Sequence, residues 1–323
     1  MRALKFLVVA IAALVASTIQ APAQEWPGKP IHFIVPFAAG GSTDVLTRLL
    51  CEQLTLELRT PCVVENKGGA GGNMGGAAVA TSPADGYTFL VSAPGVLAYN
   101  KILYREMAFD PDKDLDPICL YAFQPNVLVV HPALPVKSVA ELIAYAKAHP
   151  HQLNYASGGV GSTSHVAGEL FKTMAGLEWQ HVPYRGTGPS LVDLLAGQVQ
   201  LTIDNLPAIL PHIKTGALRA LAISTESRVP LLPDLPTIAE AGLPGYAAIS
   251  WQMLAAPSGT PRPILDRMAS TISKLTADPA FRARMADAGA EAAGSTVDEA
   301  RAFVRQETVK WREVVLISGA KAD

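Results

Sequence analysis

The residues best suited to chemistry in this chain are two adjacent glycines followed by three residue types that favour helix starts. Gly40 and Gly41 come directly before Ser42, Thr43 and Asp44, and these last three types are good N-cap residues. The first N–H groups of a helix have no partner within it, and they lie at the positive end of its dipole. The turn therefore predicts an anion-binding site.

The sequence favours a carboxylate over a nucleotide as that anion. A phosphate-binding loop needs the pattern GxxxxGK followed by Ser or Thr, a dinucleotide fold needs GxGxxG, and neither occurs in this chain. A second interpretation stays open. Many α/β turns carry glycines for geometry alone, and Ser42 or Thr43 then only caps its helix.

The same arrangement recurs in the second half of the chain, although the sequence itself is not repeated. A short strand over 154–157 is followed by glycines, by Ser162 and Thr163, and then by a helix. Two such helix starts facing each other across a hinge suit a clamp around a small molecule. A dicarboxylate either bridges them with one end at each turn, or presents one end that both turns share with ordered water.

Strands and helices at regular spacing position these turns. The apolar run 31–35 predicts a strand buried on both faces of a sheet, and the helical spacing of apolar residues over 45–54 predicts the helix after it. Strands at 62–66 and 87–92 follow, with a glycine-rich helix start at 73–81 between them. Their carboxyl ends mark one rim of a parallel sheet, where ligands of open α/β sheets bind.

The remaining segments predict a second lobe, so that the fold class is α/β with two lobes. Gln124–Pro125 separates two strands as a candidate hinge, and 250–254 returns the chain to the first lobe. The predicted division is 24–124 and 247–323 for the first lobe and 125–246 for the second. The further predicted elements are strands at 118–123, 126–130, 181–184, 201–204 and 220–224, and helices at 138–148, 191–196, 263–277, 279–288 and 297–317.

The first 23 residues predict a signal peptide. Arg2 and Lys5 form a basic region, 6–16 is apolar, and 21–23 reads Ala-Pro-Ala, a small-residue cleavage site. Because the apolar run is too short to span a bilayer, we expect export to the periplasm and a mature chain that begins near Gln24.

Composition limits the partners. The chain has 26 Lys and Arg against 28 Asp and Glu, a net charge of −2, and loss of the two basic residues of the leader makes it −4. Nucleic acid is therefore not an expected partner. An anionic ligand must be attracted by local dipoles and not by the overall field.

Three cysteines, Cys51, Cys62 and Cys119, make an odd number for an oxidising compartment. Cys51 falls late in the first helix and Cys62 opens the next strand, so these two either pair as a disulfide or are, like Cys119, buried apolar thiols. No Cys or His pair has the spacing of metal ligands, and we expect neither a metal nor a cofactor.

No group of residues indicates an enzyme. The GxSxG elbow is absent, and so is SxxK with its partner motifs. Ser164 and His165 are sequence neighbours, an arrangement that rarely supports a nucleophile and its base. A binding protein is expected, and a secreted hydrolase is the alternative.

Motifs along the whole mature chain resemble the Bug family, the extracytoplasmic solute receptors of tripartite tricarboxylate transporters. They are WPGKPIHFIVPFAAGGSTD, VVENKGGAGGNMG, DGYTFL, SHVAGELF, VPYRGTGPS, LRALAISTESR, PDLPTIAEAGLPGY and APSGTP, in family order and spacing. The resemblance implies a type II periplasmic-binding-protein fold of the Venus flytrap kind. It also implies delivery of a carboxylate to a membrane permease of one large and one small subunit. We expect a monomer. A co-receptor that presents its ligand to a sensor kinase would share every binding residue.

The resemblance carries over to two loops. Segment 39–44 matches the first-lobe loop, and Ser157, Gly158, Gly161, Ser162 and Thr163 match the facing loop. Family ligands are di- and tricarboxylates, acidic amino acids or aromatic acids such as terephthalate, held by N–H groups, hydroxyls and bridging waters. The candidate ligand-binding residues are Phe37, Ala39, Gly40, Gly41, Ser42, Thr43, Asp44, Gly72, Asn73, Ser92, Ser157, Gly158, Gly161, Ser162, Thr163, Tyr184, Thr187 and Asp204.

Some of these candidates keep two interpretations. Asp44 is a poor partner for a carboxylate, so we expect it to fix its loop by accepting N–H bonds, unless the ligand carries an ammonium group. Asp204 either forms the cleft floor or caps the following turn. Phe37 and Tyr184 either stack on an aromatic ligand or pack beneath it. Two neighbours are expected to stay outside the site: Arg185 as a solvated loop charge and His165 as a structural histidine.

Overall fold

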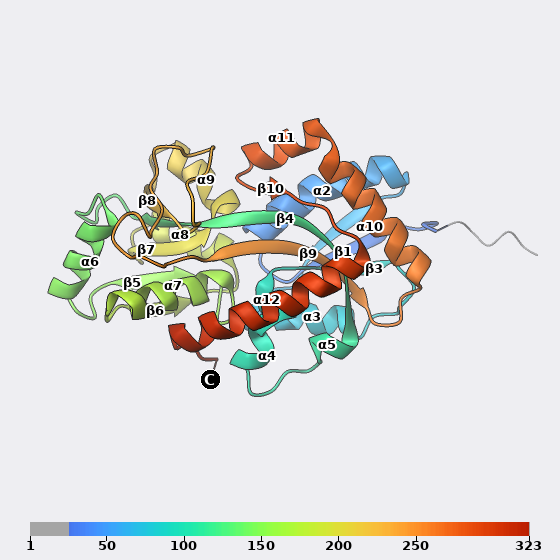
Figure 1. The fold of residues 1–323 in the computed structure, drawn as a ribbon, viewed down its shortest axis with the longest axis horizontal. Helices are drawn as coiled ribbons and strands as arrows, with labels where there is room; N and C mark the ends of the chain where they lie inside the picture. Colours follow the sequence, from blue (N-terminus) through green and yellow to red (C-terminus); the bar gives the residue numbers. More distant parts are fainter. Residues whose placement is uncertain (1–25, 323) are drawn as a thin grey trace, which may run out of the picture.

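The computed structural model describes residues 26–322, so the predicted signal peptide lies outside the described residues. The chain folds into two lobes of the predicted α/β class (Figure 1). The strands are β1 (Ile31–Val35), β2 (Cys62–Asn66), β3 (Thr88–Ser92), β4 (Leu115–Val130), β5 (Asn154–Ser157), β6 (Gln180–Pro183), β7 (Leu201–Asn205), β8 (Arg219–Ile223), β9 (Ile249–Pro257) and β10 (Glu291–Ala292). The helices are α2 (Ser42–Leu58), α3 (Asn73–Ala80), α4 (Asn100–Leu103), α5 (Pro111–Asp114), α6 (Val139–Ala148), α7 (Thr163–Ala175), α8 (Thr187–Leu195), α9 (Leu206–Lys214), α10 (Arg262–Ala277), α11 (Pro279–Asp287) and α12 (Val297–Ser318), with short turns η1 (Ala70–Gly72) and η2 (Gly95–Tyr99).

The first lobe is built on strands β2-β1-β3-β9 and the first half of β4. β1 pairs in parallel with both β2 and β3. Its side chains are buried on both faces. Phe33 belongs to a core cluster with residues of α2 and α10, whereas Ile34 belongs to another cluster with residues of η2 and α12. The unbroken apolar run of β1 follows from this double burial. The strand therefore holds the turn after it between two packed layers.

The second lobe is built on the second half of β4 with β7, β5, β6 and β8. β7, β5 and β6 are parallel neighbours. Phe171 of α7 and Leu142 of α6 pack on one face, and Leu194 of α8 and Ile209 of α9 pack on the other. The carboxyl ends of β5 and β7 lead into α7 and α9, so these helices start on the same rim of the sheet.

One predicted break in the chain is wrong. Gln124–Pro125 does not separate two strands, because β4 runs unbroken through both lobes. Up to Pro125 it pairs with β9, and from Asn126 it pairs with β7 and β8. The missing N–H of proline falls where the strand changes partners, and there the sheet tolerates it. The hinge is therefore a pair of continuous strands, β4 and β9.

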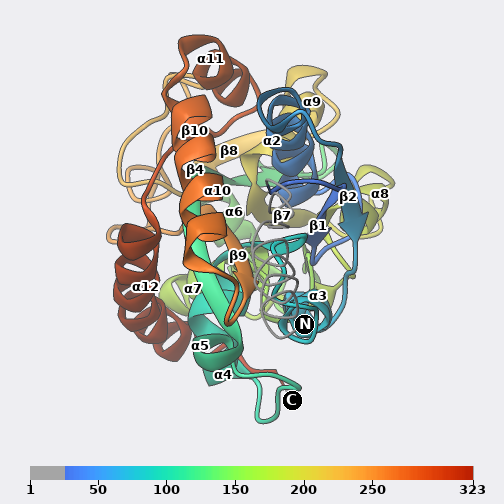
Figure 2. The ribbon, with the colours of Figure 1, turned by 90° about the vertical axis from the view of Figure 1, so that its right-hand side faces the viewer.

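Helix α12 gives a third connection between the lobes, which the sequence did not predict. It covers β4 and η2 in the first lobe and then lies beside α7 of the second (Figure 2). There the hydroxyl of Thr173 donates to the carbonyl of Ser318 at 2.9 Å. Any movement between the lobes must therefore also move the contact between α12 and α7.

No helix within residues 26–322 is long and apolar enough to cross a membrane. In the same range no three His, Cys, Asp or Glu side chains come together as metal ligands would.

Cys51 and Cys62 are free thiols in the structure but lie against each other, and we expect them to form a disulfide in an oxidising compartment. The contact with Cys62, together with burial, raises the pKa of Cys51, and the same contact lowers the pKa of Cys62. Cys119 is buried separately, near Ser273 of α10. Oxidation is favoured outside the cytoplasm.

Labelling of the denatured, unreduced protein should find one free thiol, Cys119. Three labelled thiols would show that Cys51 and Cys62 are only core residues, and a reduced sample gives the three-label reference.

Candidate ligand-binding site

A small enclosed cavity of about 20 Å³ lies between the two lobes, where the predicted turns meet. Nine of the predicted residues line it, and they come from both lobes. These residues are Phe37, Gly41, Ser42, Thr43, Gly158, Ser162, Thr163, Thr187 and Asp204. Three further lining residues were not among the candidates: Ala93, Ser164 and Asn205.

Four helices start at this cavity. α2, α7, α8 and α9 place their first residues, or the residue just before them, in its wall. Gly40 and Gly161, with φ of +81° and +82°, turn the chain into α2 and α7, a conformation that glycine adopts without strain. The lining residues include no Lys, Arg or His. Helix dipoles, N–H groups and hydroxyls therefore supply the attraction for an anion.

Asp44 anchors the first-lobe loop, as predicted. Its carboxylate accepts bonds from the N–H of Gly40 at 3.0 Å, from Arg48 at 2.9 and 3.0 Å, and from the amide of Asn66 at 3.0 Å. Burial acts to raise the pKa of Asp44, but these bonds together hold it below the usual range. Asp44 is therefore ionised and engaged, and it does not line the cavity.

Two neutral histidines hold the second-lobe loop. His165 Nδ1 accepts from the N–H of Gly161 at 3.2 Å, so His165 is the structural histidine expected. His181 stacks on it, with ring centroids 4.3 Å apart, and bonds through Nε2 to the hydroxyl of Ser157 at 2.6 Å. That hydroxyl in turn accepts from the N–H of Gly159. Burial lowers the pKa of His165 to about 4 and, helped by His165, that of His181 to about 3.

The lobes touch directly across the cavity. The hydroxyl of Ser42 donates to the carbonyl of Asn205 at 3.1 Å and accepts from the N–H of Ala208 at 3.0 Å. The hydroxyl of Tyr104 donates to the carbonyl of Val160 at 2.6 Å. A cavity of this size has room for about one water molecule. The structure therefore shows the closed arrangement, and a solute must enter with the lobes apart.

A wider pocket of about 490 Å³ opens beside the cavity and shares Gly158 with it. Segment 68–71 and Tyr104 of the first lobe face segment 158–160 and Tyr184 of the second. The hydroxyl of Tyr184 donates to Asp193 at 2.7 Å, so its ring and not its hydroxyl is available to a ligand. Arg185 is exposed at this mouth, as a solvated loop charge would be.

The other candidates support the site from outside the cavity. Asn73 accepts from the amide of Asn100 at 2.7 Å, and the hydroxyl of Ser92 donates to the carbonyl of Ala93 at 2.8 Å. The candidates that line neither the cavity nor its mouth are Ala39, Gly40, Asp44, Gly72, Asn73, Ser92, Ser157 and Gly161.

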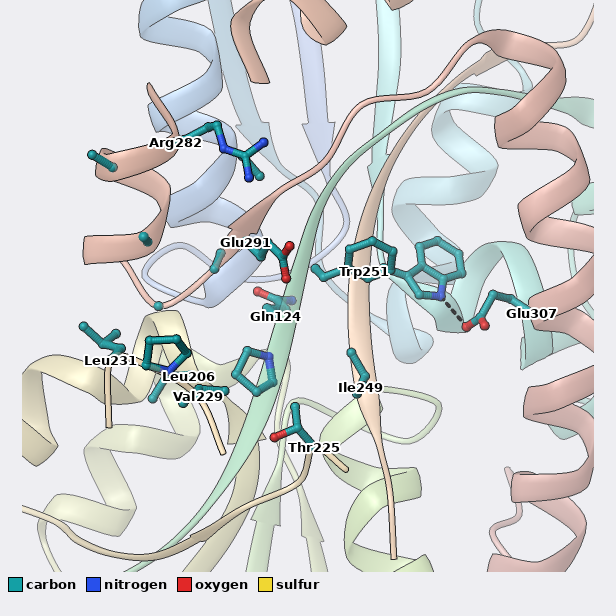
Figure 3. Close-up of a pocket in the computed structure, with 18 of the residues that line it drawn as sticks. Gln124, Leu206, Thr225, Val229, Leu231, Ile249, Trp251, Arg282, Glu291 and Glu307 are labelled. Carbon is teal, nitrogen blue, oxygen red and sulfur yellow. Dashed lines mark hydrogen bonds between the residues drawn. The ribbon is translucent and has the colours of Figure 1, made fainter. Parts of the chain in front are cut away.

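A further cavity, of about 710 Å³, lies against β4 and β9 and has none of the candidates in its lining (Figure 3). α11, the start of α9 and the segment 225–231 enclose it. Its lining is mostly apolar, and Glu307 is bonded to Trp251 beside it. Because helix starts from both lobes converge on the cavity between the lobes, that cavity remains the candidate site.

Comparison with known families agrees with this geometry. A family model described as the tripartite tricarboxylate transporter family receptor matches residues 46–319. The protein BugT of Bordetella pertussis is 40% identical over 300 residues, which is 93% of this chain and 92% of that protein.

Solved structures of similar chains share the fold. An R. palustris protein, Rpa4515, solved with adipate, has a TM-score of 0.90 and 42% identity and covers 92% of this chain and 99% of its own. MatC from Rhodopseudomonas palustris, with bound malate, has a TM-score of 0.85 and 34% identity over 90% of this chain and all of its own. The periplasmic binding protein BugD has a TM-score of 0.88 and 34% identity, and covers 92% of this chain and 100% of its own.

Proposed function

Because the chain belongs to the tripartite tricarboxylate transporter family of receptors, we propose that it captures a small carboxylate between its lobes and delivers it to a permease of that transporter type. Family membership confirms the predicted resemblance to Bug proteins and the two-lobed periplasmic-binding-protein fold. Its family and its structural neighbours are solute-binding receptors and not enzymes.

The observation that carries the proposal is the meeting of four helix starts at one cavity with hydroxyl groups and without a cation. Such a site attracts a carboxylate through dipoles and neutral donors. Both loops reach the same small cavity, so we expect them to share one carboxylate, with the lobes slightly further apart than in this structure, where the cavity has room for about one water molecule. The rest of the ligand then extends past Gly158 into the mouth near Tyr184. A dicarboxylate suits this shape, and two structural neighbours were solved with dicarboxylates, adipate and malate.

A thermal-shift screen of aliphatic and aromatic mono-, di- and tricarboxylates tests this function. At about 100 times Kd a ligand that binds only the folded state adds about 2.7 kcal/mol of stability. This raises the melting temperature by several degrees in a chain of this length. We expect dicarboxylates such as adipate to give the largest shift. The absence of a shift with every carboxylate would contradict the proposal.

Variants that lack two of the cavity hydroxyl groups test whether the ligand that raises the melting temperature binds in this cavity. Thr43→Val and Thr163→Val keep the side-chain shape and remove one hydroxyl from each lobe of the cavity. A hydrogen bond to a charged group contributes about 1.5–3 kcal/mol, so the double variant should bind at least tenfold more weakly. Thr271→Val, at a partly exposed position on α10 outside the cavity, is the matched control. Wild-type affinity in the double variant would place the ligand elsewhere.

The remaining parts of the proposal concern partners and processing. We further propose that the receptor acts as a monomer, that it is exported with a leader cleaved near Gln24, and that its lobes divide at about 124/125 and 246/247, close to the point where β4 changes partners. It leaves its ligand unchanged, so incubation of adipate with the protein should yield no product. A co-receptor for a sensor kinase uses the same site, and pull-down with the permease subunits separates these two roles.

A further inference from the structure

Asp204 is the one carboxyl group among the residues that line the cavity. It is 1% exposed. Its Oδ2 accepts from the hydroxyl of Thr187 at 2.8 Å, and its Oδ1 accepts from the N–H of Asn205 at 2.7 Å. The hydroxyl of Ser164 also acts to lower the pKa of Asp204. All of these donors are neutral, so no opposite charge compensates the carboxylate.

The charged and titratable groups on the surrounding elements are engaged elsewhere. None of them is among the groups that shift the pKa of Asp204. On α2, Asp44 pairs with Arg48. On α7, His165 bonds to Gly161, and Glu169 bonds to Tyr155 and Lys172. On α8, Asp193 bonds to Tyr184, and on α9 His212 and Lys214 lie at the end far from the cavity.

A bound carboxylate and an ionised Asp204 would be two anions in one small cavity. The four helix starts favour either anion, but both anions would compete for the same dipoles and hydroxyls. When two carboxyl groups share a site, one of them is driven to the neutral form. Burial already raises the pKa of Asp204 to about 6 in the protein without ligand.

Building on the proposed function, we propose that the site binds its solute as a carboxylate and, at the same time, takes up one proton, which Asp204 holds. The proton comes from solvent, and the only bond formed is the O–H of the neutral acid. Asp204 then changes from an acceptor that repels the ligand into a donor to a ligand oxygen. Release of the ligand returns the proton to solvent.

The pH dependence has a defined sign. Below about pH 6, Asp204 of the free protein is already protonated, so binding takes up no proton through it. Above that pH the free protein must gain a proton to bind, and Kd weakens by up to about tenfold per pH unit. Isolated carboxyl groups titrate near pH 4, and the second carboxyl group of a dicarboxylate titrates somewhat higher because the first carries a negative charge. A proton taken up by the ligand itself would persist when Asp204 is replaced by asparagine, so that variant separates the two sources.

Isothermal titration calorimetry tests the proposal on the whole mature protein. Adipate and malate are titrated at about pH 6, 7 and 8, each in two buffers of different ionisation enthalpy, which counts the protons taken up. At about pH 8 we expect uptake approaching one proton per ligand, and a Kd at least tenfold weaker than at about pH 6. Binding without proton uptake at about pH 8, where Asp204 of the free protein is ionised, would overturn the proposal.

The variant Asp204→Asn keeps the shape and cannot ionise. We expect it to bind without proton uptake, with a Kd that does not change with pH and is tighter than wild type at about pH 8. Asp116→Asn, at a carboxylate paired with Arg301, is the control and should keep wild-type uptake. Loss of adipate binding at every pH in a folded Asp204→Asn protein would also overturn the proposal, because the ionised carboxylate would then be the required form.

The outcomes distinguish this inference from the proposed function. If neither adipate, malate nor any other carboxylate binds wild type at any of these pH values, the function itself fails. If they bind without protons, only the role of Asp204 fails. The wild-type proton count decides even if the variant does not fold. Tighter binding of glutamate than of adipate, without proton uptake, would show that Asp204 instead pairs with an ammonium group.

Discussion

Replacing Gly188 by alanine is expected to weaken ligand binding at least tenfold, although it places a better helix former in α8. A β-carbon at Gly188 would lie 2.4 Å from the carbonyl oxygen of Ala39 in the other lobe. That oxygen belongs to the backbone and cannot swing away, so the lobes cannot reach the closed arrangement. Within its own lobe, the substitution replaces a glycine of α8 by alanine. In a helix interior such a replacement stabilises the folded state by about 0.5–1 kcal/mol.

A mirror variant and a control accompany this prediction. Gly95→Ala places its β-carbon 2.4 Å from the carbonyl oxygen of Gly161 and blocks closure from the first lobe. Val192→Ala, at an exposed position on α8, changes the same helix without touching the other lobe. Calorimetry with adipate should show weak binding in the two glycine variants and wild-type binding in the control. Melting of each unliganded variant confirms that it folds. Wild-type affinity in Gly188→Ala and Gly95→Ala would show that the ligand complex does not have this closed form.

Removing the carboxylate of Glu307 is expected to produce the largest loss of stability. Glu307 accepts from the indole N–H of Trp251 at 2.7 Å and from that of Trp311 at 2.9 Å, and it joins β9 to α12 (Figure 3). The two tryptophans are 1% and 2% exposed. Glu307→Ala leaves two buried donors without acceptors, each costing about 1–3 kcal/mol. We expect a total loss of about 2–5 kcal/mol and a melting temperature lower by about 5–10 °C.

Two variants separate this bond from other effects at the same place. Glu307→Gln keeps one acceptor oxygen and should lose less than half as much stability as Glu307→Ala. Lys310→Ala removes an exposed charge near Glu307 and should change stability by less than about 0.5 kcal/mol. Melting curves of the three variants test this. An unchanged melting temperature in Glu307→Ala would mean that water replaces the carboxylate.

Local signals were enough to predict the first turn of the site and most of the elements around it. The apolar run before Gly40, the N-cap residues after Gly41 and the helical spacing beyond them all point to the same unit, and the structure contains it as β1 and α2. Asp44 was expected to accept N–H bonds, and it accepts one from Gly40. These inferences depend only on residues close together in the sequence, so they can be made without knowledge of the whole fold.

The meeting of four helix starts could not be predicted, because it depends on strand order. β7 lies between β4 and β5, and this order brings the start of α9 to the start of α7, where Asn205 and Thr163 bond to each other. α9 itself was missed because Pro207 and Pro211 interrupt its apolar pattern. Proline is tolerated in the first turn of a helix, and Pro207 occupies that turn. α8 begins at Thr187 and not near Leu191, so its start also belongs to the cavity.

The role of α12 and the continuity of β4 were hidden for a similar reason. A proline between two apolar runs ordinarily argues against a central strand, and nothing local shows that β4 changes partners at Pro125. Helix α12 was predicted at nearly its observed length, but its contact with α7 joins parts of the chain more than a hundred residues apart. Ser164 and Asn205 line the cavity and directly follow predicted residues in the sequence. They were not predicted, because no local pattern distinguishes a residue that lines a cavity from one that packs behind its wall.

Hydrogen exchange with and without a saturating dicarboxylate tests the central claim most directly, namely that the solute is held where the helix starts of the two lobes meet. Adipate, or the carboxylate that gives the largest thermal shift, should slow exchange in peptides covering 36–45 and 157–165 together, because closure buries the loop N–H groups of both lobes. Peptides that line the hinge cavity, 225–231 and 282–292, should show a smaller change. Protection confined to those hinge peptides, or to one lobe only, would contradict the account.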